Sequence, residues 1–180
     1  MHKDVKKILI THLEIVEKCQ ELGALINQDY QDEPPLLVAL LKGSVPFLAE
    51  LIKNLKIDVE YDFMDVSSYE GTESIGDVKI LKDLDQSIRG RKILLVEDIV
   101  DTGNTIKEVT RLLANKGASE VKVVSLLDKP SRRVVDLKID YLGFEIPNEF
   151  VIGFGLDYNE KYRNLPYVAV LKEEIYDEVL

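Results

Sequence analysis

Three carboxylates and a group of small, hydroxyl-bearing residues stand together near the middle of the chain. Glu97, Asp98 and Asp101 follow the apolar run 93–96, and residues 102–105 (T-G-N-T) come directly after them. A small-residue loop that leads into a helix binds phosphate, because backbone N–H groups and threonine hydroxyls point at the anion. The carboxylates would repel phosphate. We therefore expect them to face sugar hydroxyls, a metal ion or a proton in transfer.

The same loop has a simpler explanation as a helix N-cap. Asp, Thr and Asn are preferred at that position whether or not a ligand binds. The three acids favour a functional site, since a cap needs only one of them. His2 and His12 are the only histidines and lie far from the loop in the sequence. A carboxylate is therefore the leading candidate if the chemistry needs a general base.

Buried strands and helical segments alternate along the chain. The apolar runs 36–41, 93–96 and 121–127 are typical of strands buried on both faces of a parallel sheet. Further strands are expected at 5–10, 59–63, 78–84, 139–144, 150–154 and 167–171, and helices at 12–26, 46–55 and 106–116. This alternation predicts an α/β fold whose mostly parallel sheet is flanked by helices. A length of 180 residues fits a single domain.

The three long buried strands end in loops that could do chemistry. Lys42-Gly43 follows the first strand, the acids follow the second, and Asp128-Lys129 follows the third. Ligands of such sheets bind beyond the carboxyl ends of the strands, so one edge of the sheet should collect all three loops. Residues 67–77 show no periodicity, and we interpret them as a long lid or a hairpin tip.

The composition excludes several classes of protein. The formal net charge of −10 argues against nucleic acid as a partner. No run approaches the roughly 18 apolar residues of a membrane span, and the N-terminus lacks the apolar region of a signal peptide. Cys19 is the only cysteine, so no internal disulfide can form. We expect a cytoplasmic protein that binds neither membrane nor nucleic acid, and that needs a divalent cation to hold a polyanion.

The string 91–105 resembles the phosphoribosyl pyrophosphate signature of the type I phosphoribosyltransferases. That signature consists of a hydrophobic strand, two acids, two apolar residues and then D-T-G-x-T. The segment 143–160 (G-F-E-I-P-N-E-F-V-I-G-F-G-L-D-Y-N-E) is similar to the hypoxanthine-guanine phosphoribosyltransferases. So are L-K-G-S at 41–44, the pair Ser68-Tyr69, and Lys129. The resemblance covers about residues 36–171, in the same order as in the family.

This resemblance implies a type I phosphoribosyltransferase fold, with a core at about 34–130 and a small hood formed by the N- and C-terminal segments 1–12 and 131–180. It implies transfer of the phosphoribosyl group from phosphoribosyl pyrophosphate to hypoxanthine or guanine, giving IMP or GMP and pyrophosphate in purine salvage. It also implies a Mg²⁺ cofactor and a homodimer or homotetramer. The alternatives are a phosphoribosyltransferase for adenine, or for xanthine and guanine, and a nucleotide-sensing regulator on the same fold.

The resemblance also implies a role for each motif residue around the sugar and the phosphates. Asp101 would be the general base or acid at purine N7. Lys42 and Gly43 would bind pyrophosphate, on a backbone with a cis peptide bond, and Arg163 would contact the same group. The magnesium ligands would be Glu97, Asp98 and Asp157. The 5′-phosphate would lie on Thr102, Gly103, Asn104 and Thr105.

The remaining implied roles concern the base. Lys129 would reach the purine 6-oxygen, Phe150 would stack on the ring, and the backbone of Val151 would bond to its pyrimidine edge. Ser68 and Tyr69 would close over the reaction centre. Judged without the family, Lys129 could be a solvated loop lysine, Phe150 a core residue, Asp157 part of a turn, and Arg163 one half of a surface ion pair worth little.

Overall fold

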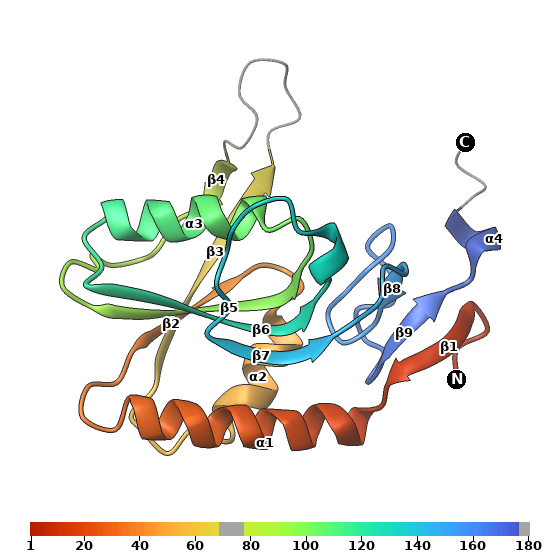
Figure 1. The fold of residues 1–180 in the computed structure, drawn as a ribbon, viewed down its shortest axis with the longest axis horizontal. Helices are drawn as coiled ribbons and strands as arrows, with labels where there is room; N and C mark the ends of the chain where they lie inside the picture. The colour runs from red at the N-terminus through yellow and green to blue at the C-terminus, as the bar shows by residue number, and fades with distance from the viewer. Residues whose placement is uncertain (69–77, 177–180) are drawn as a thin grey trace.

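A six-stranded sheet forms the centre of the computed structural model (Figure 1), which describes residues 1–68 and 78–176. Its order is β4-β3-β2-β5-β6-β7. The strands are β2 (Leu36–Leu40), β3 (Glu60–Ser68), β4 (Val78–Lys82), β5 (Lys92–Val100), β6 (Glu120–Asp128) and β7 (Tyr141–Glu145). All neighbouring pairs from β3 to β7 are parallel, and β4 joins the edge antiparallel to β3. The predicted mostly parallel sheet is confirmed.

Helices cover both faces of this sheet. Figure 1 shows α1 (His12–Asp29) and α2 (Val45–Ile52) on one face and α3 (Asn104–Asn115) on the other. α1 begins with the capping box that the sequence indicates, because Thr11 accepts from the N–H of Glu14 and the Glu14 carboxylate accepts from the N–H of Thr11. Apolar side chains of β2 and β5 are buried in two clusters, one under each layer of helices. No helix in the described residues is long and apolar enough to cross a membrane.

β5 and β6 are longer than the sequence predicted. The prediction ended both strands with their apolar runs, but the paired backbone continues as far as Val100 and Asp128. Glu97 and Asp98 therefore lie within a strand rather than in the loop after it. Hydrophobicity does not mark this part of β5, because the polar residues Glu97 and Asp98 interrupt the apolar pattern although strand pairing continues and Asp98 and Val100 are buried.

A second sheet joins the two ends of the chain. β1 (Val5–Ile10), β9 (Val168–Leu171) and β8 (Val151–Ile152) lie antiparallel in that order, and the short helix α4 (Glu173–Tyr176) follows β9. Figure 1 shows this sheet beyond the carboxyl end of β7, as the predicted hood. β8 is shorter than the predicted strand 150–154, because residues 153–155 have φ angles of 92°, 48° and 100° that no extended strand adopts.

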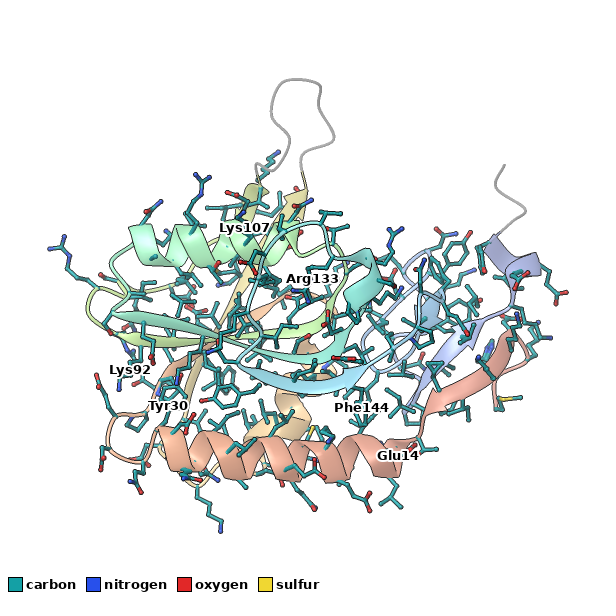
Figure 2. The ribbon with its side chains drawn as sticks, viewed as in Figure 1. Glu14, Tyr30, Lys92, Lys107, Arg133 and Phe144 are labelled. Atoms are coloured by element: carbon teal, nitrogen blue, oxygen red, sulfur yellow. The ribbon has the colours of Figure 1, made fainter. Side chains whose placement is uncertain are left out.

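β7 departs from the predicted division of the chain. Residues 131–180 were expected in the hood, but β7 pairs with β6 in the large sheet. Phe144 of β7 points toward α1 in Figure 2, and Nζ of Lys18 lies 5.4 Å from the centre of its ring. The C-terminal part of the hood therefore begins after β7 rather than near residue 131.

The predicted lid at 67–77 lies mostly outside the described residues. Ser67 and Ser68 are the last residues of β3 and pair with Lys79 and Val78 of β4, so the strand extends further than predicted. Tyr69 belongs to the stretch 69–77 that the structure does not describe.

Candidate active site

The loops at the carboxyl ends of β2 and β5 lie in direct contact. A Cβ atom on Gly43 would lie 1.8 Å from Oδ2 of Asp98, so any side chain at position 43 would displace this carboxylate. The Leu41–Lys42 peptide bond is cis, in the stretch where the resemblance implied one. A Cβ atom on Gly155 would lie 1.9 Å from the carbonyl oxygen of Gly43. The turn after β8 therefore closes on the same loop, and three segments far apart in the sequence meet.

Glu97 and Asp98 form a buried pair of carboxyl groups. Asp98 is 9% exposed, and its Oδ1 accepts a hydrogen bond from the N–H of Ile99 at 2.8 Å. Burial, with the neighbouring charge of Asp98, raises the pKa of Glu97 well above its ordinary value, and burial also raises the pKa of Asp98. Two such carboxylates do not both ionise without a compensating cation or donor. Burial therefore favours the protonated form of Glu97 in the free site, and a bound cation would favour its ionised form.

The predicted phosphate loop leads into α3. Gly103 is the N-cap of this helix with a φ of 87°, a conformation that favours glycine, and the N–H of Lys107 bonds to its carbonyl at 3.0 Å. The N–H groups of a helix's first turn have no partner within the helix. Such N–H groups can bind an anion, and here the N–H of Asn104 donates to Oγ1 of Thr102 at 3.4 Å. The predicted phosphate site at residues 102–105 stays a prediction.

Arg133 anchors the segment between β6 and β7, which passes over this loop. Its Nη2 contacts Oδ1 of Asp128 and its Nη1 donates to the carbonyl of Leu137 at 3.0 Å. A Cβ atom on Gly103 would lie 2.9 Å from Cδ of Arg133. Figure 2 shows Arg133 on the stretch that crosses the N-terminal end of α3. Gly103 is thus required for its φ and for this close approach together.

A pocket of about 410 Å³ opens beside the phosphate loop, between β5 and the hood. Four of the predicted residues line it, namely Asp101, Lys129, Phe150 and Val151. Ile99, which the sequence did not single out, lines the pocket as well. An aromatic ring, an aliphatic side chain and a few polar groups in one pocket suit a flat heterocycle with polar edges.

Four charged side chains line this pocket, namely Asp101, Lys129, Arg132 and Glu149, and the first three interact with one another. Asp101 forms an ion pair with Arg132, with 3.0 Å between Oδ1 and Nε. Lys129 is only 8% exposed. Burial lowers the pKa of Lys129, and the charge of Asp101 partly opposes this. The short 3-10 helix η1 (Pro130–Arg132) that follows Lys129 brings Arg132 back toward Asp101. Arg132 is a second residue that sequence reasoning missed.

The aromatic ring of Phe150 packs against the rings of two tyrosines. Its ring is stacked on Tyr176 of α4, with 5.0 Å between centroids and 23° between planes, and it meets Tyr158 edge-on at 5.6 Å. Neither tyrosine lines the pocket, whereas Phe150 does and is 39% exposed. The default interpretation of Phe150 as an ordinary core residue is therefore wrong, because part of its ring is open to the pocket.

The remaining predicted residues gather on the turn after β8. Arg163 donates from Nη1 to the carbonyl of Gly155 at 2.8 Å, and its Nη2 lies 2.9 Å from Oδ1 of Asp157. Nζ of Lys42 lies 3.1 Å from Oε2 of Glu160, a residue that the sequence analysis passed over. Asp157 does not line the pocket that holds Phe150. Asp157 and Arg163, with Lys42 near them through Glu160, thus form a group apart from the residues that line the pocket.

The carboxylates fit a metal ion that arrives with its substrate. Within residues 1–68 and 78–176, no three His, Cys, Asp or Glu side chains gather closely enough to hold a metal by themselves. Mg²⁺ is usually bound by one or two carboxylates, with water and substrate phosphates in the other positions. Oε2 of Glu97 is buried with no hydrogen-bond partner among the described residues. Such an atom suits a metal-bound water or a sugar hydroxyl.

Comparison with known proteins decides the family. The model of the family described as "Phosphoribosyl transferase domain" matches residues 6–159. The chain belongs to the phosphoribosyltransferase family. This family membership and its type I fold confirm the resemblance seen in the sequence.

Individual relatives agree with this family over nearly the whole chain. The hypoxanthine-guanine phosphoribosyltransferase of Lactococcus lactis subsp. lactis is 55% identical over 99% of this chain and 97% of that protein. The protein of the same name from Streptococcus thermophilus (strain CNRZ 1066) is 55% identical over 99% of each. The crystal structure of a hypoxanthine phosphoribosyltransferase from Staphylococcus aureus has a TM-score of 0.94 at 50% identity, covering 98% of this chain and 96% of that one.

Proposed function

We propose that this phosphoribosyltransferase transfers the 5-phosphoribosyl group from phosphoribosyl pyrophosphate to hypoxanthine or guanine, giving IMP or GMP and pyrophosphate. The observation that carries this function is the placement of the pocket with Lys129, Asp101 and Phe150 directly beside the phosphate loop at Gly103. A nucleotide can place its base in the pocket and its 5′-phosphate on the loop at the same time. Purine salvage is the corresponding biological role.

The pocket favours a 6-oxopurine over adenine. The Lys129 ammonium has hydrogen-bond donors and no acceptor, so it pairs with a 6-oxygen and meets the 6-amino group of adenine donor to donor. The ring lies between Phe150 and Ile99, which offer apolar contact on its two faces. The backbone of Val151 bonds to the pyrimidine edge. A site whose buried polar groups are left unpaired by the wrong base can discriminate by about 10⁴–10⁵-fold.

The carboxylates act on the sugar and on the base. N9 of the purine bonds to C1 of the sugar as the bond from C1 to the pyrophosphate oxygen breaks, and Asp101 accepts the proton from N7. Glu97 and Asp98 stabilise the positive charge that develops on the ribose ring, because fixed negative charge is most effective in a site that excludes water. Thr102 and the amides of residues 103–105 hold the 5′-phosphate.

Mg²⁺ is the proposed cofactor. Glu97 and Asp98 would hold one ion near the ribose hydroxyls, and Asp157 would hold another. Bound there, the metal neutralises the negative charge of the pyrophosphate leaving group. Lys42, with the backbone of Gly43, and Arg163 bind the pyrophosphate oxygens. We also propose a cytoplasmic location. We further propose that the protein is a homodimer or homotetramer, and the mass of the purified protein in solution tests this oligomeric state.

The test is a competition among four purines. The purified chain is supplied with phosphoribosyl pyrophosphate, Mg²⁺ and equal concentrations of hypoxanthine, guanine, adenine and xanthine, and the nucleotides formed are separated and quantified. We expect IMP and GMP, little XMP, and no AMP. AMP formed as fast as IMP would refute the base assignment. No nucleotide from any purine would refute the transferase itself.

A Lys129→Gln variant in the same assay tests the residue behind the selectivity. Glutamine offers both a donor and an acceptor, so the exclusion of adenine should loosen while turnover of hypoxanthine falls. The control is Lys138→Gln, which removes an exposed lysine paired only with Asp140. Unchanged selectivity in Lys129→Gln would remove Lys129 from the base site.

A further inference from the structure

Glu160 contacts both of the side-chain cations that are expected to bind pyrophosphate. Its Oε2 accepts from Nζ of Lys42 at 3.1 Å, and its Oε1 lies 3.4 Å from Nη2 of Arg163. Lys42 belongs to the loop after β2 and Arg163 to the turn after β8, 121 residues later by their numbers. One carboxylate thus bridges the two loops where a diphosphate would bridge them.

The turn itself places this carboxylate. Asn159 and Glu160 have φ angles of 50° and 60°, in the left-handed region, and the N–H of Glu160 donates to Oδ2 of Asp157 at 2.9 Å. Non-glycine residues adopt this conformation uncommonly, and such outliers cluster at functional sites. The backbone is therefore fixed, whereas the Glu160 side chain is 65% exposed and can rotate into solvent.

Arg163 does not depend on Glu160 for its position. Its guanidinium is held by the carbonyl of Gly155 at 2.8 Å and by Asp157 at 2.9 Å, both shorter contacts than the one to Glu160. Loss of the Glu160 charge would therefore leave Arg163 in place and free its outer N–H group. The same change would leave Lys42 without its carboxylate partner.

We propose that Glu160 competes with pyrophosphate for Lys42 and Arg163. Its carboxylate occupies the two cations in the free enzyme, rotates away when the diphosphate of the substrate binds, and returns when pyrophosphate leaves. This inference rests on the proposed assignment of Lys42 and Arg163 to pyrophosphate. Its consequence is that Glu160 weakens pyrophosphate binding and hastens product release, so its removal should tighten binding.

The expected effect is modest because the competing ion pairs are exposed. Lys42 and Glu160 are 62% and 65% exposed, and pairs of this kind contribute little. We expect Glu160→Gln to bind pyrophosphate about two- to fivefold more tightly than the natural protein. The difference should shrink as the salt concentration rises, since salt screens exposed charges.

The experiment is calorimetric titration of the whole protein with pyrophosphate in excess Mg²⁺. Glutamine keeps the size of Glu160 and removes its charge. The matched control is Glu60→Gln, which removes the same charge from a side chain that is 69% exposed and paired with Arg91 at 3.0 Å. Glu60 begins β3, at the end of the sheet opposite the site. The control should bind pyrophosphate as the natural protein does, so a general effect of net charge would be visible as tightening in both variants and would overturn the proposal.

A Lys42→Met variant separates the inference from the function on which it rests. If Lys42→Met binds pyrophosphate as tightly as the natural protein, the assignment of Lys42 is wrong and the inference falls with it. If Lys42→Met binds more weakly while Glu160→Gln binds equally or more weakly, the site is right and only the competition is refuted. Tighter binding by Glu160→Gln, together with weaker binding by Lys42→Met, is the result that the proposal expects.

Discussion

Two segments of the chain determine the surroundings of Asp101, whose carboxylate interacts with the cations Lys129 and Arg132. The loop after β5 carries it into the pocket, and η1 brings Arg132 to within 3.0 Å of its carboxylate. Lys129 lines the same pocket from the end of β6. The two histidines lie at positions 2 and 12, before and after the hood strand β1, and neither lines the pocket. Two carboxylates line the pocket, Asp101 and Glu149, and Glu149 is paired with Lys7 at 2.8 Å. We propose that Asp101 is the one that exchanges a proton with a purine ring nitrogen.

Asp101→Asn should lower turnover by about 10²–10⁴-fold, the usual contribution of a general acid or base. Asparagine keeps the shape of the side chain and cannot take up a proton from N7. GMP should still bind, because its base and phosphate contacts lie on other residues. The measurement pairs steady-state turnover with calorimetric titration of GMP. Turnover close to that of the natural protein would show that another group moves the proton.

The residues that the sequence could predict are those whose chemistry is local. Glu97, Asp98 and Asp101 are close in the sequence, and three acids beside a phosphate-binding loop are hard to explain as a cap alone. Arg132 and Glu160 could not be predicted in this way. Their contacts, to Asp101 and to Lys42, cross between loops that only the folded chain brings together. Nothing in the sequence distinguishes Ile99 from other apolar strand residues, and only the structure shows that it lines the pocket.

At the scale of elements, the hood forms one side of the pocket that is proposed to bind the purine base. Phe150 precedes β8, and Tyr176 of α4 stacks on its ring. α4 is tied in turn to β1, because Nζ of Lys6 lies 2.7 Å from Oε1 of Glu173 and the N–H of Lys172 bonds to the carbonyl of Asp4. The two ends of the chain therefore act together to hold one aromatic ring against the pocket.

Tyr176→Ala should raise the KM for hypoxanthine about two- to tenfold, because an aromatic pair contributes roughly 0.5–1.5 kcal/mol and its loss frees the Phe150 ring to move. The KM for phosphoribosyl pyrophosphate should not change, since that substrate binds outside this stack. Tyr176→Phe is the matched control and should behave as the natural protein. A rise in both KM values, or in neither, would contradict the stacking role. Initial rates with each substrate varied in turn provide the measurement.

The positions of strands and helices along the chain followed well from hydrophobic periodicity, whereas the strand ends did not. Periodicity reports the pattern of apolar residues, and β5 continues past its apolar run through Glu97 and Asp98 to Val100. β7 was assigned to the hood by its place in the chain, but the partner that decides its sheet is β6. Pairing between distant segments depends on the whole fold. The residues of a single strand do not indicate which other strand it pairs with.

At the scale of the whole molecule, the charge balance is the physical reason to expect dependence on a metal ion. The chain carries a formal net charge of −10 and must bind a substrate with several phosphate groups. In the free site, Lys42 and Arg163 already contact Glu160 and Asp157. Because these two cations are already paired, we expect a metal ion that arrives with the substrate to supply additional positive charge.

Chelation of divalent cations should therefore abolish turnover, and added Mg²⁺ should restore it. The protein should stay folded throughout, because no described group of residues depends on a bound metal for its arrangement. The measurement is IMP formation in excess chelator and after Mg²⁺ is returned, with circular dichroism as the control for folding. Persistent IMP formation in the chelator would remove the metal from the mechanism.

The central claim is that one nucleotide spans the pocket and the phosphate loop, and a crystal structure of the GMP complex tests it most directly. The purine ring should lie between Ile99 and Phe150, with its 6-oxygen about 2.7–3.2 Å from Nζ of Lys129. The 5′-phosphate should accept hydrogen bonds from the amides at the start of α3. A base bound outside this pocket, or a 6-oxygen turned away from Lys129, would contradict the account.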